Sequence, residues 1–476
     1  MMQAKLLSED ALERIHCASL SILERTGVVI PHAEVLSRFA DAGAQVDHAA
    51  QRVRIPPELV MQSIASAGKQ FTLYGRDLGK TAAFGVGRRN YNSIAGEAYW
   101  VDEIGQARRP ACLADVGRAA RMGDALDWIN LVGAMADPHE LPAASRCVEV
   151  MVVLLKGTTK PIHFWYHDRA SAAYLNEVMI AVRGDAETAA RFPLCYPFLE
   201  PISPLQFPFD GVDLLFETAR LNLPVPIGPM AQMGVSAPMS VAGTMALENA
   251  EILAGLCITQ LIRPGLPVCY GGICHAFDMR TTQLIFAGPE QVLFGVGMTQ
   301  LGKRYGLPVY INVGLTDAKL PDAQAGLEIA ATLGFGAAAG ADIFGHLGIC
   351  GVDQATSLDM LVLQNEAISY FERVLAPVDV SDEALALDLI DEAGPGGSFL
   401  AEMHTVERLR SELWNPTILD RQYYQAWLDD GARDTASRCR ARKEALLAEH
   451  QCEPLAPDLA RALDAIAAAA RRHLAS

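Results

Sequence analysis

Short apolar runs, most of them led by proline, recur through the middle of the chain and carry polar residues at their ends. They are INLVGAM at Ile129, PIHFWYHD at Pro161, PLCYPFLEP at Pro193, PVPIGPM at Pro224, PVCYGGI at Pro267, PVYINVG at Pro308 and ADIFGHLG at Ala341. Runs of this length that are rich in β-branched and aromatic residues predict buried strands. The stretches between them, such as residues 142–156, 171–183, 212–222, 242–262 and 289–305, have the length and apolar content of helices.

Strands and helices that alternate at this spacing predict a TIM (β/α)8 barrel, because eight such units fill about 250 residues. The fold class is therefore α/β, with an N-terminal helical segment before the barrel and C-terminal helices after it. Seven strands are clear, and two places fit the eighth: AAFGVG near Ala82, or the chain after Glu372. A doubly wound open sheet is the structural alternative, but no GxGxxG motif opens a helix after the first strand.

The flanking segments also contain recognisable elements. Ser8 is placed to cap a first helix that Gly27 ends, and VRIP at Val53 predicts a short strand. NYNSIAGEAYWVD, from Asn90 to Asp102, predicts a hairpin with its turn at Gly96. The chain then divides into an N-terminal helical and hairpin segment (1–110), the barrel (111–375) and a C-terminal helical segment (376–476). That last segment is expected to end in two helices, 423–450 and 457–474.

Composition narrows the class of protein. The chain has 476 residues, of which 51% are hydrophobic, and a formal net charge of −17, which disfavours a nucleic-acid partner. Its ten cysteines contain no CxxC pair, which favours reduced thiols in a cytoplasmic protein. Acidic residues interrupt the first apolar run, so it predicts neither a signal peptide nor a membrane span.

The carboxyl ends of barrel strands are where a site is expected. Polar residues there are His167, Glu200, Gln232, His275, Asp317 and His346, and aromatic residues are Trp165, Tyr166, Phe198, Tyr270, Phe277, Tyr310 and Phe344; the hairpin adds Tyr91. Few of these side chains are acids or bases. Aromatic faces bind quaternary ammonium groups, so the composition favours a cationic ligand, although core packing produces the same aromatic strand ends.

Two other chemistries have weaker support. Strand alternation places His163, Trp165 and His167 on one face, a row that could bind a metal, but no carboxylate or cysteine joins it at short range, so we expect no metal. Lys319 is a candidate for a Schiff base, as in aldolase-like barrels. It follows the strand on a polar loop, where an ordinary exposed lysine is the simpler interpretation.

The chain resembles the trimethylamine methyltransferase family over nearly its whole length. The resemblance is carried by Ile22–Val28, Ala95–Leu126, Ser203–Leu205, Gly234–Gly255, Phe286–Glu328, Gly394–Thr405 and Asn415–Trp427. It implies a methanogenesis-type one-carbon methyltransferase with a TIM barrel, a methylated amine as substrate, and a small cobalamin-carrying partner that docks over the barrel mouth. Family members that use trimethylamine carry pyrrolysine near the position of the Gly314–Lys319 loop, whereas this chain has ordinary residues throughout. That departure favours the branch that acts on quaternary amines such as glycine betaine.

The resemblance implies transfer of a methyl group from a quaternary amine to the cobalt(I) of a corrinoid protein, with release of a tertiary amine. The corrinoid belongs to the partner, and none is expected to bind this chain tightly. No catalytic acid or base is assigned; aromatic residues would cage the ammonium and His346 would hold a carboxylate. Two alternatives stay open: a folate-linked demethylase without a corrinoid, and a betaine-binding protein without catalysis. A homo-oligomer without membrane contact is expected.

Overall fold

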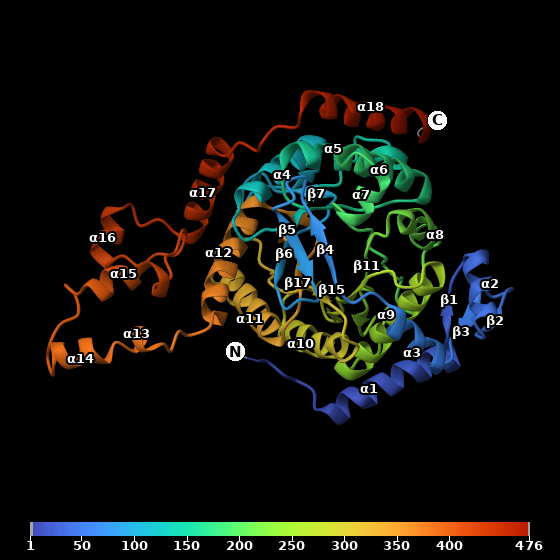
Figure 1. Ribbon diagram of the computed structural model, residues 1–476, viewed down its shortest axis with the longest axis horizontal. Coiled ribbons are helices and arrows are strands. Elements are labelled where there is room, and N and C mark those ends of the chain that lie inside the picture. The colour runs from blue at the N-terminus through green and yellow to red at the C-terminus, as the bar shows by residue number, and fades with distance from the viewer. Residues whose placement is uncertain (1–2, 475–476) are drawn as a thin grey trace.

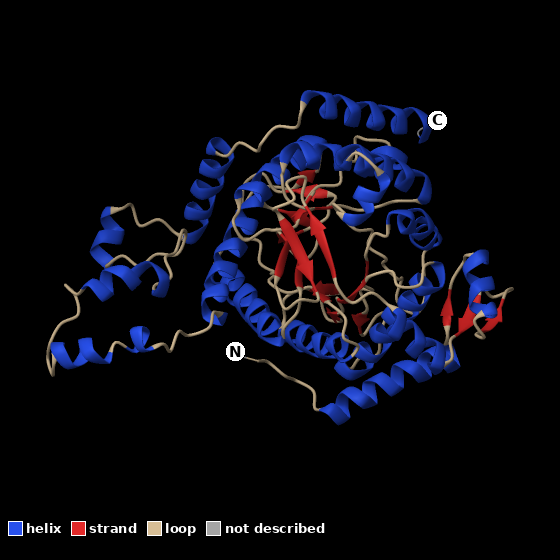
Figure 2. Ribbon diagram, in the orientation of Figure 1, coloured by secondary structure: helices blue, strands red, loops and turns tan. Residues whose placement is uncertain are grey.

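A ring of short parallel strands lies at the centre of the structure, which is a computed structural model that describes residues 3–474 (Figures 1 and 2). Five strands form a continuous sheet in the order β11 (Val225–Ile227), β13 (Val268–Gly272), β16 (Val309–Ile311), β17 (Ile343–Leu347) and β6 (Asn90–Ser93). Each neighbouring pair is parallel. This order follows the chain except at β6, so the first strand of the barrel pairs with the last.

The remaining part of the ring is made of shorter segments. Strand β9 (Val132–Gly133) pairs in parallel with β10 (Ile162–His163), and a parallel bridge from Asn92 to Leu131 joins β6 to β9. Residues 194–199 complete the circle, because Ile162 N donates to Leu194 O at 3.1 Å and Leu199 bridges Ile227. The ring is therefore closed, and the predicted TIM-barrel fold class is confirmed.

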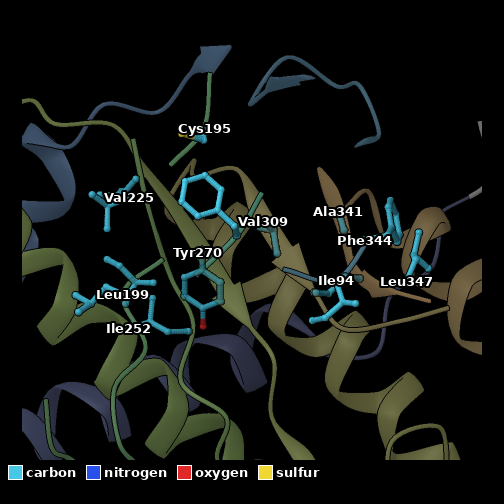
Figure 3. Packing of buried hydrophobic residues seen from close by; sticks show 14 of the residues in the cluster. Ile94, Cys195, Leu199, Val225, Ile252, Tyr270, Val309, Ala341, Phe344 and Leu347 are labelled. Carbon is cyan, nitrogen blue, oxygen red and sulfur yellow. The ribbon is translucent and has the colours of Figure 1, made fainter. Parts of the chain in front are cut away.

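Helices surround the ring and follow the strands in turn. They are α4 (Leu113–Ala125), α5 (Ala143–Gly157), α6 (Arg169–Arg183), α7 (Ala186–Arg191), α8 (Phe209–Thr218), the 3-10 turn η2 (Ala219–Leu221), α9 (Val241–Ile262), α10 (Pro289–Arg304), α11 (Ala323–Ala339) and α12 (Leu358–Leu375). Outward-facing strand residues pack beneath them. Figure 3 shows Val225, Tyr270, Val309 and Phe344 from four successive strands in this layer, with Ile252 of α9.

Helix α9 is buried on nearly every side and mostly apolar. Its 22 residues are numerous and apolar enough to cross a membrane by length and composition alone, but most of them are buried inside the protein. A helix that is hydrophobic all round is expected wherever the helix is enclosed by a large core. α9 is such a core helix, and it is the one membrane-span candidate among residues 3–474.

The amino-terminal end of the barrel, its bottom, is closed by a hairpin of β4 (Phe71–Tyr74) and β5 (Thr81–Phe84). Leu73 and Phe84 of this hairpin pack with Tyr196 and Tyr310 from the barrel interior. The segment near Ala82 is thus a plug and not the eighth strand.

Strand β6 is the eighth strand, which corrects two expectations. It pairs in parallel with β17, so Asn90–Asp102 is not a hairpin, and the barrel begins before the boundary expected at residue 110. This strand was not predicted because its sequence is polar.

The chain that follows β6 forms β7 (Tyr99–Trp100), which pairs with β8 (Arg109–Pro110) and β19 (Ala355–Thr356) above the barrel; β18 (Ile349–Cys350) completes that sheet. A second small sheet at the same end contains β12 (Gln232–Met233), β14 (His275–Asp278) and β15 (Gln283–Ile285).

The N-terminal segment packs beside α9. It contains α1 (Glu9–Ser21), the π-turn η1 (Ile22–Thr26), α2 (Ala33–Asp41), α3 (Pro57–Ser66) and a sheet of β1 (Val28–Val29), β2 (Gln45–Asp47) and β3 (Arg52–Arg54). Ser8 caps α1 by accepting a hydrogen bond from Ala11 N, and Gly27 follows η1 with φ 72°. Both predictions for this helix, and the short strand at Val53, are confirmed.

After α12 the chain leaves the barrel. Four short helices, α13 (Asp382–Leu385), α14 (Leu387–Ala393), α15 (Met403–Glu412) and α16 (Tyr424–Asp429), project away from it, and we call residues 376–430 the arm (Figure 1). The chain then returns through α17 (Thr435–Glu449), which packs on α12, and α18 (Pro457–Leu474), which packs on α5 and α6. The helix expected over 423–450 is thus two helices, broken where Gly431 and Ala432 adopt positive φ.

Candidate functional site

The carboxyl ends of the barrel strands, which we call the mouth, bring together side chains that point into the ring. Alternation along one strand decides which residues these are. After β10, His163 and Trp165 face inward with ring centroids 5.7 Å apart, whereas Phe164 and Tyr166 stack on each other at 5.2 Å on the outer side. The alternation predicted from the sequence is therefore confirmed for these four residues, whereas His167 lies beside the start of α5.

An aromatic wall lines one side of the mouth. It consists of Trp165, Phe198, Tyr310 and His346, which come from four different strand ends. Trp165 lies 6.2 Å from Phe198 and 6.3 Å from His346, and Tyr310 lies 5.3 Å from Phe198 and 5.9 Å from His346, between ring centroids. Trp165 is fixed in place because its indole N–H donates to the carbonyl of Gly96 at 2.9 Å. Its ring and that of Phe198 are only half-buried, so they face the open end.

His163 lies beneath this wall with no solvent exposure. Asn92 Nδ2 donates to His163 Nδ1 at 2.8 Å, which places the imidazole proton on Nε2. Nε2 has no hydrogen-bond partner among the described residues, nor does Asn92 Oδ1. Burial, and secondarily the nearby His346, lower the pKa of His163 to about 3, so the ring is neutral. It therefore offers one free N–H donor to the interior of the mouth.

His346 combines burial with backbone strain. Its φ of 67° lies in the left-handed region that side chains other than glycine rarely adopt, and such strain concentrates at functional sites. Neither ring nitrogen has a hydrogen-bond partner within residues 3–474, and burial lowers the pKa to about 3. The preceding residue must be glycine, because a Cβ at Gly345 would overlap the hydroxyl of Tyr310. Two unsatisfied buried nitrogens on a strained residue make His346 a candidate for contact with a ligand.

A third buried histidine lies next to these. His275 Nε2 is 3.3 Å from Asn312 Nδ2, and its ring stacks on Phe286 with centroids 4.3 Å apart. Burial lowers the pKa of His275 to about 3 as well. Asn312 Oδ1 has no partner among the described residues. The mouth thus contains neutral hydrogen-bonding groups, and its histidines carry no charge near neutral pH.

Carboxylates form the outer edge of the mouth. Burial, and then the neighbouring Asp353, raise the pKa of Glu97 well above its usual range, with smaller contributions from Asp137 and Glu200. Burial likewise raises the pKa of Asp353. Glu200, although its side chain reaches solvent, has its pKa raised to about 7 by the surrounding protein and by Asp353. The edge therefore holds acids crowded closely enough to resist ionisation, an arrangement that a bound cation would relieve.

Four of the expected aromatic residues lie outside the ring. Tyr91 stacks on Phe344 at 5.1 Å, and its hydroxyl donates to Glu372 of α12. Tyr270 donates to Asn249 Oδ1 of α9 at 2.8 Å. Tyr166, as described above, shares the outer side. Each of the four occupies the outward position of its strand or strand extension, so the structure does not bring them to the mouth.

The remaining expected residues lie at the edge of the mouth or away from it. His167 Nδ1 is 2.8 Å from Ala143 O, beside the start of α5. Gln232 pairs with His275 in the register of β12 and β14. Asp317 accepts from Phe286 N at 2.8 Å and fixes a loop. Lys319 is exposed and donates to the carbonyl of Asp317 at 2.7 Å, as an ordinary surface lysine does.

Several residues of the mouth were absent from the expected site. They are Asn92, His163, Glu97, Asn312 and Asp353. Alternation would have found the first two, since Asn92 is the inward neighbour of Tyr91 and His163 precedes Trp165 by two positions. The carboxylates give no such signal, because Glu97 and Asp353 approach each other only through the fold. Within residues 3–474, no group of three His, Cys, Asp or Glu is placed to hold a metal ion.

Comparison with known proteins identifies the family of this chain. A family model described as trimethylamine methyltransferase (MTTB) matches residues 1–475. The trimethylamine methyltransferase MttB of Methanosarcina barkeri is 29% identical over 477 residues, covering 98% of this chain and 95% of that protein. The glycine betaine methyltransferase of Desulfitobacterium hafniense strain Y51 is also 29% identical, over 466 residues, covering 97% and 96%. Among solved structures, the monomethylamine methyltransferase MtmB of Methanosarcina barkeri superimposes with a TM-score of 0.52 at 13% identity, covering 93% of this chain and 88% of that one, which supports the fold.

Proposed function

We propose, from the premise that this chain belongs to the trimethylamine methyltransferase family and is a methyltransferase, that it takes a methyl group from a quaternary amine and passes it to the cobalt of a corrinoid protein. One observation carries the choice of substrate. The aromatic wall faces buried neutral donors and acceptors that have no partners of their own among the described residues. Such a site matches a ligand with an ammonium group at one end and a hydrogen-bonding group at the other.

The ammonium is expected against the aromatic wall. The face of an aromatic ring carries the negative side of its quadrupole, which attracts a cation that has been removed from water, and Trp165 and Phe198 are the two half-buried rings of the wall. Glu200 at the edge adds a carboxylate whose raised pKa indicates that its surroundings favour either a proton or another positive charge. A quaternary ammonium supplies that charge permanently.

The hydrogen-bonding end is expected at His163 and His346. The Nε2–H of His163 is a free donor, and His346 can donate from whichever nitrogen carries its proton. A carboxylate such as that of glycine betaine would accept from both. Binding of a carboxylate by His346 was expected from the sequence. His163 is a second donor to which no such role was assigned from the sequence.

The neutral histidines suit a methyl transfer that needs no acid or base. The departing nitrogen keeps the electron pair of the broken C–N bond and leaves as a neutral tertiary amine, so no proton has to be delivered to it. The reduced cobalt of a corrinoid protein, when docked, would supply the electron pair for the new bond to the methyl carbon. The chain itself holds the cation, orients one methyl group toward the open end and excludes water.

The partner that carries the corrinoid is expected over the edge of the mouth near the sheet of β12, β14 and β15. Val235, Met239 and Met279 are exposed there by 57%, 67% and 61%. The sulfur atoms of Met239 and Met279 both lie within 4 Å of the same point, the position a Cβ would take on Gly234. Adjacent exposed methionines are adaptable contacts for a protein partner. Location in the cytoplasm stays a prediction.

The test is a methyl-transfer assay with chemically defined acceptors. We expect the purified chain to convert glycine betaine to dimethylglycine when reduced free corrinoid or the cognate corrinoid protein is supplied, with the change in corrinoid absorbance matching the product. Trp165→Ala should slow this reaction, whereas Trp128→Ala, which removes a half-buried tryptophan at the bottom of the barrel, should not. Transfer to tetrahydrofolate without a corrinoid would favour the folate-linked alternative. Turnover of trimethylamine alone would refute the choice of a quaternary amine.

A further inference from the structure

The arm is built almost without a core of its own. None of the residues of α13, α14, α15 and α16 is buried. Large apolar side chains on it remain open to solvent: Val378, Val380, Leu387, Leu400, Met403, Val406, Tyr423 and Tyr424 are each at least 62% exposed. Soluble monomers rarely leave so many large apolar side chains together on one surface, and such surfaces mark interaction sites.

The arm is nevertheless held in one position. Arg373 near the end of α12 donates to the carbonyl of Glu412 at 2.7 Å, and the indole of Trp414 donates to Ser369 Oγ at 2.9 Å. Both contacts join the end of this segment to α12, so residues 376–411 form a long loop that is attached to the barrel at both ends. Arg408 of α15 pairs with Asp379 at 3.1 Å. Polar contacts, rather than apolar packing, thus set the position of α13 relative to α15.

An apolar groove lies on the barrel beside the point where the arm begins. It occupies about 490 Å³ between α11 and α12 and is lined by Gln3, Ala4, Leu327, Ala330, Ala331, Gly334, Phe335, Ala338, Phe371, Val374 and Leu375. Leu327 and Phe335 are 71% and 53% exposed within it. The arm of the same chain projects away from this groove (Figure 1) and leaves it open.

The arm and the groove differ in charge. Residues 374–407 contain eight acidic residues and no lysine or arginine. The groove adjoins a second hollow of about 660 Å³, whose lining includes Lys5, Arg88, Arg89, Lys303 and Arg304 but a single acid, Glu9. Arg89, Lys303 and Arg304 already pair with Glu372, Asp342 and Glu13, so the unpaired cations of this hollow among the described residues are Lys5 and Arg88. An acidic, apolar segment therefore matches a groove that is apolar along one side and basic along the other.

We propose that the arm of one copy of this chain occupies the groove of a second copy, and that the second arm occupies the first groove. Helix α14 is the segment that fits: Leu387 and Ile390 lie one turn apart on one face, while Asp388 and Asp391 flank them. An amphipathic helix laid in a groove is a common mode of recognition. An exchange in which each copy gives its arm and receives that of the other closes on itself with twofold symmetry.

This interface leaves the mouth free. Barrel helices run opposite to the strands, so the end of α12, where the arm leaves, lies at the bottom of the barrel. Glu372 near that end pairs with Arg89 just before β6, which agrees with this position. A dimer formed through the arm is thus compatible with a corrinoid partner at the mouth, and the proposal does not depend on the substrate.

The test uses the full chain and sedimentation velocity over a range of concentrations. We expect a dimer for the wild type. An arm variant, Leu387→Glu with Ile390→Glu, and a groove variant, Phe335→Glu, should each raise the dimer dissociation constant by at least about tenfold, since buried anchors dominate interfaces. Met61→Glu on α3 is the matched control, because Met61 is 46% exposed and lies on neither surface. Circular dichroism verifies that each variant is folded.

Mixing the two variants provides the decisive measurement. The arm variant keeps an intact groove and the groove variant keeps an intact arm, so their mixture can form one complete contact. Exchange predicts that the mixture dimerises more tightly than either variant alone. A wild type that stays monomeric, or a mixture no tighter than its separate components, would overturn the proposal. An assembly unaffected by both the arm variant and the groove variant would place the interface elsewhere and overturn it equally.

Discussion

Replacing Trp165 with alanine should weaken the binding of a quaternary amine about tenfold. Its ring is one face of the aromatic wall, 6.2 Å from Phe198 and 6.3 Å from His346, and it is only half-buried without a ligand. A cation that leaves water for such a face gains about 1–2 kcal/mol, which corresponds to a factor of about 5–30 in Kd. Trp165→Phe keeps a face but loses the hydrogen bond to Gly96, so we expect an intermediate loss.

Calorimetric titration with choline and with its neutral carbon analogue separates charge from shape. Both ligands fill the same volume, but only choline has a charge for the ring to attract. Trp165→Ala should therefore weaken choline far more than the neutral analogue. Trp128→Ala, at the bottom of the barrel, should change neither. Equal losses for the two ligands would show that the tryptophan acts through shape, and no loss in a folded variant would show that it serves packing alone.

Three further outcomes are expected. His346→Ala should weaken glycine betaine more than choline, because choline has no carboxylate; equal losses in calorimetry would remove that role. Affinity for choline should rise from pH 6 to pH 8, because the pKa of Glu200 is about 7 and its carboxylate ionises across this window, whereas titrations of Glu200→Gln should be independent of pH. Lys160→Met should lower the free energy of unfolding in urea by about 3–5 kcal/mol, because Lys160 Nζ donates to three buried carbonyls that would lose their donor; a loss below 1 kcal/mol would show that water replaces it.

Most of the fold could be predicted from the sequence because the barrel strands are buried on both faces. Runs such as PVCYGGI and PVYINVG must be apolar throughout, and their regular spacing is visible without any structure. Strand β6 escaped for the opposite reason. Its residues Asn90–Ser93 are polar and fully enclosed, and a polar run gives no hydrophobic period to detect. The same polarity supplies Asn92 to the mouth, so the strand that was hardest to predict contributes to the candidate site.

The site could be predicted only in part, because a residue's position at the end of a strand does not by itself show whether its side chain points into the barrel or away from it. Trp165, Phe198, His275 and His346 were expected and face the mouth, whereas Tyr270 was expected and faces α9. Alternation separates these cases once the register is known. Contacts between distant segments, such as the approach of Asp353 to Glu97, depend on how loops pack and have no signature in either sequence segment.

The unpartnered polar atoms of the mouth place a condition on the ligand beyond its charge. His163 Nε2, both nitrogens of His346 and the amide oxygens of Asn92 and Asn312 are buried without partners among the described residues. A group left unsatisfied in this way costs about 1–3 kcal/mol, so a ligand that displaces water without replacing its hydrogen bonds forfeits that amount. Tetramethylammonium would satisfy the aromatic wall and nothing else. Choline adds one hydroxyl, and glycine betaine adds two carboxylate oxygens that can accept from the N–H groups of His163 and His346 but leave the two amide oxygens unpaired. Affinity should rise in that order if the histidine donors dominate, and a mouth that bound all three equally would derive its specificity from the cation alone.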